Sequence, residues 1–159
     1  MKTALRKLEW DDWPYFTKWW RDKELISLTS GNFEPLSDEN IKNQVKEMAE
    51  DSNSWHWMIQ ADDRIVGHIN LNKISEEKAE LQIVIGEKEY WGKGIGQQAS
   101  NQVFQETKDL GFKKIYIEVR PENFRAIDLY QKLGFQNLGL KKYPDNPNLS
   151  EVIMMEKEI

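Results

Sequence analysis

Apolar and polar residues alternate in seven short segments of the chain, a pattern typical of strands with one buried face. In residues 79–86 the alternating apolar positions are Leu81, Ile83 and Ile85. Similar patterns predict the other strands at about 3–8, 55–61, 64–72, 113–119, 136–142 and 151–158. Only Asp62 and Asp63 separate the second strand from the third, so we expect these two strands to form a hairpin.

Four other segments repeat their apolar residues at helical spacing. Asp11 or Asp12 is expected to cap the first helix, and the second follows Pro35-Leu36-Ser37. The third helix starts at Ile95 and ends near Gly111, and the fourth covers residues 124–133. The residues expected to face inward include Trp13, Phe16, Trp20, Ile41, Val45, Met48, Ala99 and Val103. This mixture of elements predicts an α/β fold with a mixed sheet.

The composition is that of a single small domain covering residues 1–159, with a net charge of −5 and no cysteine. Lack of cysteine excludes disulfides, thiolate metal sites and a cysteine nucleophile. The acidic balance argues against general nucleic-acid binding and is compatible with a cationic substrate. The first residues lack the apolar segment of a signal peptide, and no run is long enough to span a membrane, so we expect a cytoplasmic protein. No carboxylate pattern accompanies His56 or His68, so we assign these residues no metal or catalytic role.

A glycine-rich turn, Tyr90-Trp91-Gly92-Lys93-Gly94-Ile95-Gly96, joins the strand at 79–86 to the helix that starts at Ile95. Glycines let the backbone turn sharply and bring its N–H groups close to a ligand, and a helix N-terminus adds partial positive charge. The turn therefore favours a site for a pyrophosphate. A plain glycine-rich turn without a ligand is the alternative interpretation of this motif alone.

Two nucleotide-binding patterns compete for these residues. The P-loop pattern fails, because no Gly-Lys-Ser/Thr closes the turn. The dinucleotide pattern is partly met by Gly94-Ile95-Gly96-Gln97-Gln98-Ala99, with Glu118 at a suitable distance. Residues 87–91 separate these glycines from the strand, however, whereas a dinucleotide turn follows its strand directly.

A second motif lies in residues 115–135, where Asn123, Ala126, Leu129, Tyr130, Gly134 and Phe135 form the pattern N-x-x-A-x-x-L-Y-x-x-x-G-F. With the glycine turn before it, this segment resembles the GNAT superfamily of acyl-CoA-dependent N-acetyltransferases, and especially its ribosomal-protein N-terminal acetyltransferase branches. The resemblance covers residues from about 55 to 159 well. One departure is Trp91, which stands where the family usually has Arg or Gln.

The resemblance implies a GNAT fold: a mixed, mostly antiparallel central sheet with a splayed parallel pair, flanked by about four helices. It also implies acetyl-CoA as co-substrate, without a metal. The residues expected to bind acetyl-CoA are Ile83, Val84, Ile85, Trp91, Gly92, Lys93, Gly94, Ile95, Gly96, Asn123 and Tyr130. Asn123 can equally be the N-cap of the helix that follows it.

Acetyl transfer to an amine requires a base for the amine, stabilisation of an oxyanion and a proton for the departing thiolate. Glu118 is the predicted base, in an E-V-R segment like that of the ribosomal-protein enzymes. A surface glutamate or a partner of Arg120 is the alternative role. Tyr130 is the predicted acid, with core packing as its alternative. The resemblance to the family also implies that a backbone N–H of the strand within Gln82–Ile85 binds the oxyanion.

The predicted function is transfer of an acetyl group from acetyl-CoA directly to a primary amine. Peptide N-termini, polyamines, lysine side chains and other small amines all remain open as acceptors. A homodimer is possible by analogy with the family. The alternative function is a CoA- or dinucleotide-binding module without transferase activity.

Overall fold

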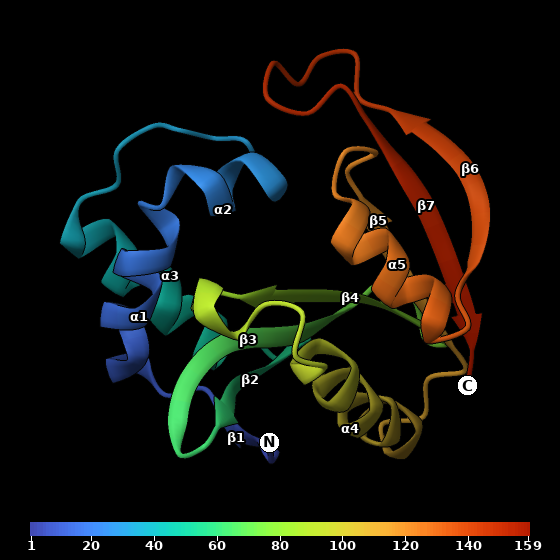
Figure 1. Ribbon diagram of the computed structural model, residues 1–159, viewed down its shortest axis with the longest axis horizontal. Coiled ribbons are helices and arrows are strands. Elements are labelled where there is room, and N and C mark those ends of the chain that lie inside the picture. Colours follow the sequence, from blue (N-terminus) through green and yellow to red (C-terminus); the bar gives the residue numbers. More distant parts are fainter.

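The computed structural model describes residues 1–159 as a seven-stranded sheet with helices on both faces (Figure 1). Only β4 and β5 run parallel, and every other neighbouring pair is antiparallel, as predicted. In spatial order the strands are β1 (Thr3–Lys7), β2 (Ser54–Ala61), β3 (Arg64–Lys73), β4 (Lys78–Ile85), β5 (Lys114–Val119), β7 (Glu151–Glu158) and β6 (Gln136–Lys142).

Five α-helices accompany the sheet, one more than the sequence pattern predicted. They are α1 (Trp13–Trp20), α2 (Lys23–Leu28), α3 (Asp38–Glu50), α4 (Ile95–Asp109) and α5 (Phe124–Lys132), with 3-10 turns η1 (Trp10–Asp12) and η2 (Lys88–Tyr90). The prediction missed α2, which is too short for a helical repeat to show. Its N-cap is Asp22, whose carboxylate accepts the backbone N–H groups of Glu24 and Leu25.

The cap predicted for α1 is only partly correct. Asp12 occupies the N-cap position, but its carboxylate makes no capping hydrogen bond with that helix. It pairs instead with Arg6 at 2.6 Å and accepts the backbone N–H of Glu9. Trp13 and Trp20, which were expected to face inward, are partly buried and pack against the core. The most buried tryptophan of α1 is Trp19, which the prediction did not include and which faces Gly86 at the end of β4.

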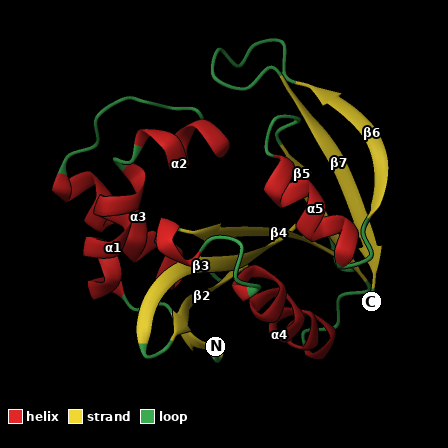
Figure 2. Cartoon of the chain, viewed as in Figure 1, coloured by secondary structure: helices red, strands yellow, loops and turns green.

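Two apolar cores lie on opposite faces of the sheet. Figure 2 shows the helices that cover these faces. The larger contains residues of α4 and α5, including Ile95, Ala99 and Val103. The smaller lies beneath α1–α3 and includes Phe16, Ile41 and Val45. The residues that helical spacing predicted to face inward therefore belong to two separate cores.

The parallel pair is splayed, as expected. β4 and β5 are paired only from Lys78 to Glu80 on β4, opposite Lys114 to Tyr116 on β5. Beyond Glu80 the two strands diverge, and this side of residues 81–85 of β4 has no neighbouring strand. Backbone groups there are available to a ligand. Separately, none of the helices combines the length and the apolar character required to cross a membrane.

Candidate active site

The glycine turn forms a cradle at the start of α4. Gly92 and Gly94 have φ of 72° and 79°, values that L side chains rarely adopt, and Gly94 is the N-cap of α4. A side chain added at either glycine would meet no atom within 4 Å, so the space in front of this backbone is open. Gly96 serves packing instead, because an added Cβ would lie 3.1 Å from a Leu129 methyl group. The geometry fits a pyrophosphate held by backbone N–H groups and the helix dipole.

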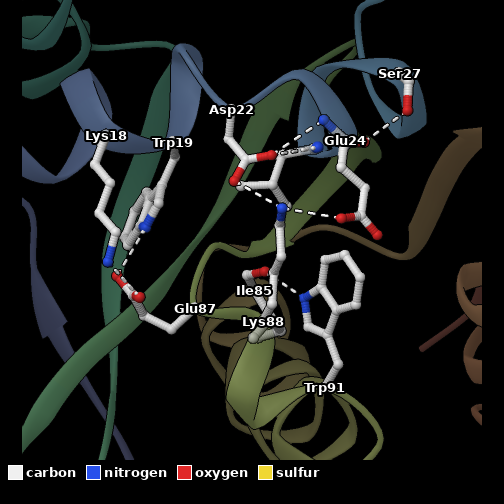
Figure 3. Close-up of polar contacts among 10 residues, drawn as sticks. Lys18, Trp19, Asp22, Glu24, Ser27, Ile85, Glu87, Lys88 and Trp91 are labelled. Carbon is white, nitrogen blue, oxygen red and sulfur yellow. Dashed lines mark hydrogen bonds and ion pairs between the residues drawn. The ribbon is translucent and has the colours of Figure 1, made fainter.

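Trp91, the departure from the family pattern, packs against the C-terminal end of β4. Its indole N–H donates to the carbonyl of Ile85 at 2.7 Å (Figure 3). The guanidinium of Arg125, from α5, lies 3.9 Å from the centre of the indole ring. Trp91 therefore places an arginine beside the cradle, although the cradle itself has none.

A cavity of about 240 Å³ extends from this cradle between β4 and α5. Nine of the residues predicted to bind acetyl-CoA line it: Ile83, Val84, Ile85, Trp91, Gly92, Gly94, Ile95, Gly96 and Asn123. Lys93 does not; its ammonium group lies over the Tyr90 ring. Arg125 adds positive charge to the lining, whereas Lys132, which also lines the cavity, pairs with Asp128 at 2.8 Å.

Asn123 is the N-cap of α5, so the helix-cap interpretation is confirmed. Its side-chain oxygen accepts the backbone N–H of Ala126 at 3.3 Å, and its amide nitrogen donates to the Leu28 carbonyl at 3.3 Å. Asn123 thereby joins α5 to the end of α2. Its contact with a bound cofactor stays a prediction.

A larger cavity of about 1050 Å³ lies on the α1–α3 side of the sheet. The two cavities meet between the end of α2 and the point where β4 and β5 diverge. They share six lining residues: Leu25, Leu28, Thr29, Ile83, Val84 and Asn123. Carboxylates dominate the charged groups of its lining: Glu34, Glu47, Asp51, Glu80 and Glu118. Arg120 is the one lysine or arginine that lines it.

Tyr130 lines the larger cavity from α5. The residue is 5% exposed, and its ring packs edge-on against Phe135 at a centroid distance of 5.5 Å. Burial raises the pKa of its hydroxyl, so this group keeps its proton at neutral pH. The hydroxyl has no hydrogen-bond partner in the protein, which leaves it free to donate to a ligand.

Glu118 also lines this cavity, but other residues already bind its carboxylate. The hydroxyl of Tyr116 donates to it at 2.8 Å, the hydroxyl of Tyr143 donates to its other oxygen, and Lys141 lies 3.4 Å away. The alternative pairing with Arg120 is not observed, because that guanidinium donates to the carbonyls of Thr29 and Asn148.

Glu80 is a cavity carboxylate that the sequence analysis did not single out. It is half-buried and has no hydrogen bond or ion pair with the protein. Burial, and then the nearby charge of Glu118, raise its pKa. Its position is the last paired residue of β4 before the splay, opposite Tyr116. Polar Glu80 and Gln82 on one face of an otherwise apolar strand were the only available signal.

The helices above the larger cavity are tied to the loop between β4 and α4 (Figure 3). The indole N–H of Trp19 donates to Glu87 at 3.2 Å. Gly86 has no room for a side chain, since an added Cβ would lie 2.2 Å from the Trp19 indole. The ion pairs that join the two parts are Lys18–Glu87 (2.6 Å), Lys88–Asp22 (2.9 Å) and Lys88–Glu24 (2.9 Å).

Comparison with curated proteins finds relatives that are acetyltransferases. An uncharacterized N-acetyltransferase of Bacillus licheniformis is 28% identical over 152 residues, covering 87% of this chain and 82% of that protein. A spermidine N(1)-acetyltransferase of Escherichia coli is 34% identical over 96 residues, covering 56% of this chain and 49% of that protein. The chain spans 18% of an uncharacterized Methanocaldococcus jannaschii protein, with 35% identity over 89 residues.

Among solved structures, a spermidine N-acetyltransferase from Vibrio cholerae in complex with CoA and spermine has the same fold. Its TM-score is 0.85 at 23% identity, over 98% of this chain and 95% of that chain. The family model described as the acetyltransferase (GNAT) domain matches residues 2–136. This match covers the cradle, the splayed strands, Glu118 and Tyr130. The chain therefore belongs to the GNAT family of acetyltransferases.

Proposed function

We propose that this enzyme transfers an acetyl group from acetyl-CoA directly to a cationic primary amine. The observation that carries the proposal is the meeting of two cavities at the splay of β4 and β5. One cavity opens on a glycine cradle suited to pyrophosphate, and the other is lined by carboxylates. When bound, acetyl-CoA would supply an activated thioester; the protein would position both reactants and move the protons.

The carboxylate lining supports a cationic acceptor, because it attracts ammonium groups and disfavours anionic substrates. The relatives agree with this class, since their names specify spermidine. Peptide N-termini, which the resemblance to ribosomal-protein enzymes suggested, remain the competing acceptors.

Two carboxylates stand near the splay, and we propose that they have different tasks. Glu80 has all its lone pairs free and a raised pKa, both of which suit a base that accepts the proton of the amine. Glu118, with three donors around it, contributes negative charge that holds the ammonium. Tyr130 keeps its proton and has an unpartnered hydroxyl, which suits the predicted donation to the leaving sulfur.

Thiol release from acetyl-CoA, measured with a thiol-reactive dye, tests this function. The chain has no cysteine, so the enzyme itself contributes no signal. The acceptor panel should contain polyamines, alkyl monoamines, lysine and peptides with free N-termini. We expect release with cationic amines and little with acidic peptides.

CoA binding, measured by calorimetry, separates the alternatives. Tight CoA binding without release from any acceptor would favour a binding module instead of a transferase. Absence of CoA binding would contradict the assignment of the cradle.

A further inference from the structure

The floor of the larger cavity contains a chain of hydrogen bonds that the proposed mechanism does not use. It runs from Asp51, exposed at the end of α3, to Ser54 and His56 on β2 and then to His68 on β3. The links are 3.0 Å from Ser54 Oγ to Asp51 Oδ2, 2.9 Å from Ser54 Oγ to His56 Nε2, and 2.9 Å from His56 Nδ1 to His68 Nε2. All four residues line the cavity.

The direction of each hydrogen bond follows from the chemistry of the groups. Hydrogen bonds from the backbone of Asn53 and from Ser54 lower the pKa of Asp51, so its carboxylate only accepts and the Ser54 hydroxyl donates to it. Because the Ser54 hydroxyl proton is already donated to Asp51, Ser54 Oγ can only accept a hydrogen bond from His56. His56 therefore carries its proton on Nε2. Neutral His56 then presents a bare Nδ1, which accepts from the Nε2–H of His68.

Both imidazoles are neutral at physiological pH. Burial lowers the pKa of His56 to about 4, against the opposing charge of Asp51. Burial, followed by the proximity of His56, lowers the pKa of His68 to about 3. The chain therefore fixes His68 as the Nε2–H tautomer with Nδ1 unprotonated.

His68 Nδ1 has no hydrogen-bond partner in the protein, although the residue is only 9% exposed. One side of the ring is covered by Phe16, which packs edge-on at a centroid distance of 5.0 Å. The side chain lines the cavity. On β4 the partner of His68 is Val84, which lies in the part of that strand that has separated from β5. The Nδ1 lone pair is therefore open to a hydrogen-bond donor from a ligand in the cavity.

The position of His68 relative to Glu80 defines the length of such a ligand. Glu80 is paired with Asn72 on β3, four residues from His68 on the same face. Four residues of strand span about 13 Å, so groups bound by the two side chains lie on the order of 10 Å apart. Glu47 and Asp51 line the same cavity and add negative charge.

Resting on the proposed transferase function, we propose that His68 Nδ1 accepts a hydrogen bond from the second nitrogen of an elongated diamine or polyamine acceptor. The reacting nitrogen lies near Glu80, and the second nitrogen lies about 10 Å away at His68. A monoamine with the same alkyl length fills the cavity but leaves His68 unpaired. The chain of Asp51, Ser54 and His56 acts as a positioning device that keeps the His68 lone pair available.

Nitrogen-15 NMR of the imidazoles tests the tautomer without any turnover, and the chain has only two histidines to resolve. In the free protein at pH 7 we expect both rings neutral and protonated on Nε2. Addition of 1,8-diaminooctane should shift the Nδ1 resonance of His68, whereas octylamine should not. A cationic His68, an Nδ1–H tautomer, or equal responses to the two amines would overturn the proposal.

Kinetics with α,ω-diamines of four to twelve carbons provide the second readout. For the wild-type enzyme we expect the lowest KM near eight carbons. His68→Phe should raise KM for that diamine about tenfold, as expected for loss of one hydrogen bond to a charged group, with kcat and octylamine kinetics little changed. An unchanged dependence of KM on diamine length in His68→Phe would contradict the subsite.

Variants of the chain separate positioning from packing. Ser54→Ala should raise KM for the diamine as His68→Phe does. Ser54→Thr keeps the hydroxyl, so its KM for the diamine should stay near the wild-type value. Ser100→Ala is the matched control, because Ser100 is buried without a hydrogen-bond partner. Ser54→Ala behaving like Ser100→Ala would exclude a positioning role. If no amine were acetylated, the proposed function would fail, and the NMR titration with 1,8-diaminooctane would still decide the subsite.

Discussion

Replacement of Glu80 by Gln is the substitution that distinguishes the two carboxylates. Gln keeps the size of the side chain and removes its ability to accept a proton. Removal of a general base lowers rates by about 100-fold to 10,000-fold, so we expect kcat to fall at least about 100-fold at pH 7. The loss should diminish as pH approaches the pKa of the amine, about 10, because the amine is then deprotonated in solution and needs no base.

We expect Glu80→Gln to lower activity without lowering thermal stability. Glu80 has a raised pKa in the folded protein, so its stabilising contribution is complete below the pKa of the unfolded chain and is lost as pH rises through the folded value. Glu80→Gln removes this ionisation, and we expect the melting temperature at pH 7 to be unchanged or higher. The difference should disappear in acid, where wild-type Glu80 is protonated.

Glu118→Gln is the matched control for this prediction. The hydroxyls of Tyr116 and Tyr143 would lose a charged acceptor, and each such hydrogen bond contributes about 1.5–3 kcal/mol. Both tyrosines are half-buried and can partly turn to water, so we expect a net destabilisation of about 1–3 kcal/mol. Its activity should decline similarly across pH.

Thiol release from pH 6 to 10 measures activity, and thermal unfolding at pH 4 and 7 measures stability. The assignment of Glu80 is refuted if Glu80→Gln retains wild-type turnover at pH 7. It is equally refuted if Glu118→Gln shows the steep loss at neutral pH that recovers at high pH.

Three other substitutions or conditions give separate tests. Tyr130→Phe should lower kcat about 100-fold and leave CoA affinity, measured by calorimetry, unchanged, because the hydroxyl has no partner in the protein; weaker CoA binding would indicate a packing role. Gly94→Ala places a side chain at a φ of 79°, so we expect destabilisation of about 1–2 kcal/mol and weaker CoA binding; unchanged affinity would argue against the cradle. Because the pKa values of His56 and His68 lie near 4 and 3 in the folded protein and about 6.5 in the unfolded chain, the unfolded chain binds more protons in acid. The free energy of unfolding should therefore decrease as pH falls from about 6.5 to 4, and a smaller decrease in His68→Phe, by denaturant titration, would confirm the cause.

The strands and long helices were predictable because each has one buried face, which the sequence shows as a repeat. The turn at Asp62 and Asp63 was equally visible, and both residues have positive φ, at 51° and 64°. The short helix α2 was not predictable in this way, since six residues give less than two helical turns. Asp12 occupies the expected N-cap position, but its side chain makes no capping hydrogen bond because its carboxylate pairs with Arg6 of β1.

The candidate site was predictable where one local motif carries the geometry, as in the glycine cradle and the α5 segment. Properties that depend on the pairing of distant strands were not. The tyrosines around Glu118 come from β5 and from the segment after β6, and the isolation of Glu80 depends on where β4 and β5 part. His56 and His68 become neighbours only through the register of β2 against β3.

The close fit of Trp19 against Gly86 limits how this domain can be recombined with its relatives. Residues of α1 and α2 line the larger cavity, where we propose that the acceptor binds, so a chimera designed for a new specificity would exchange these helices. Donor helices without the complementary indole would leave a void above Gly86, and a donor loop with any side chain at residue 86 would collide with Trp19. The salt bridges from Glu87 and Lys88 impose the same condition. The unit of exchange is therefore discontinuous in sequence: residues 13–28 must be transferred together with residues 86–88.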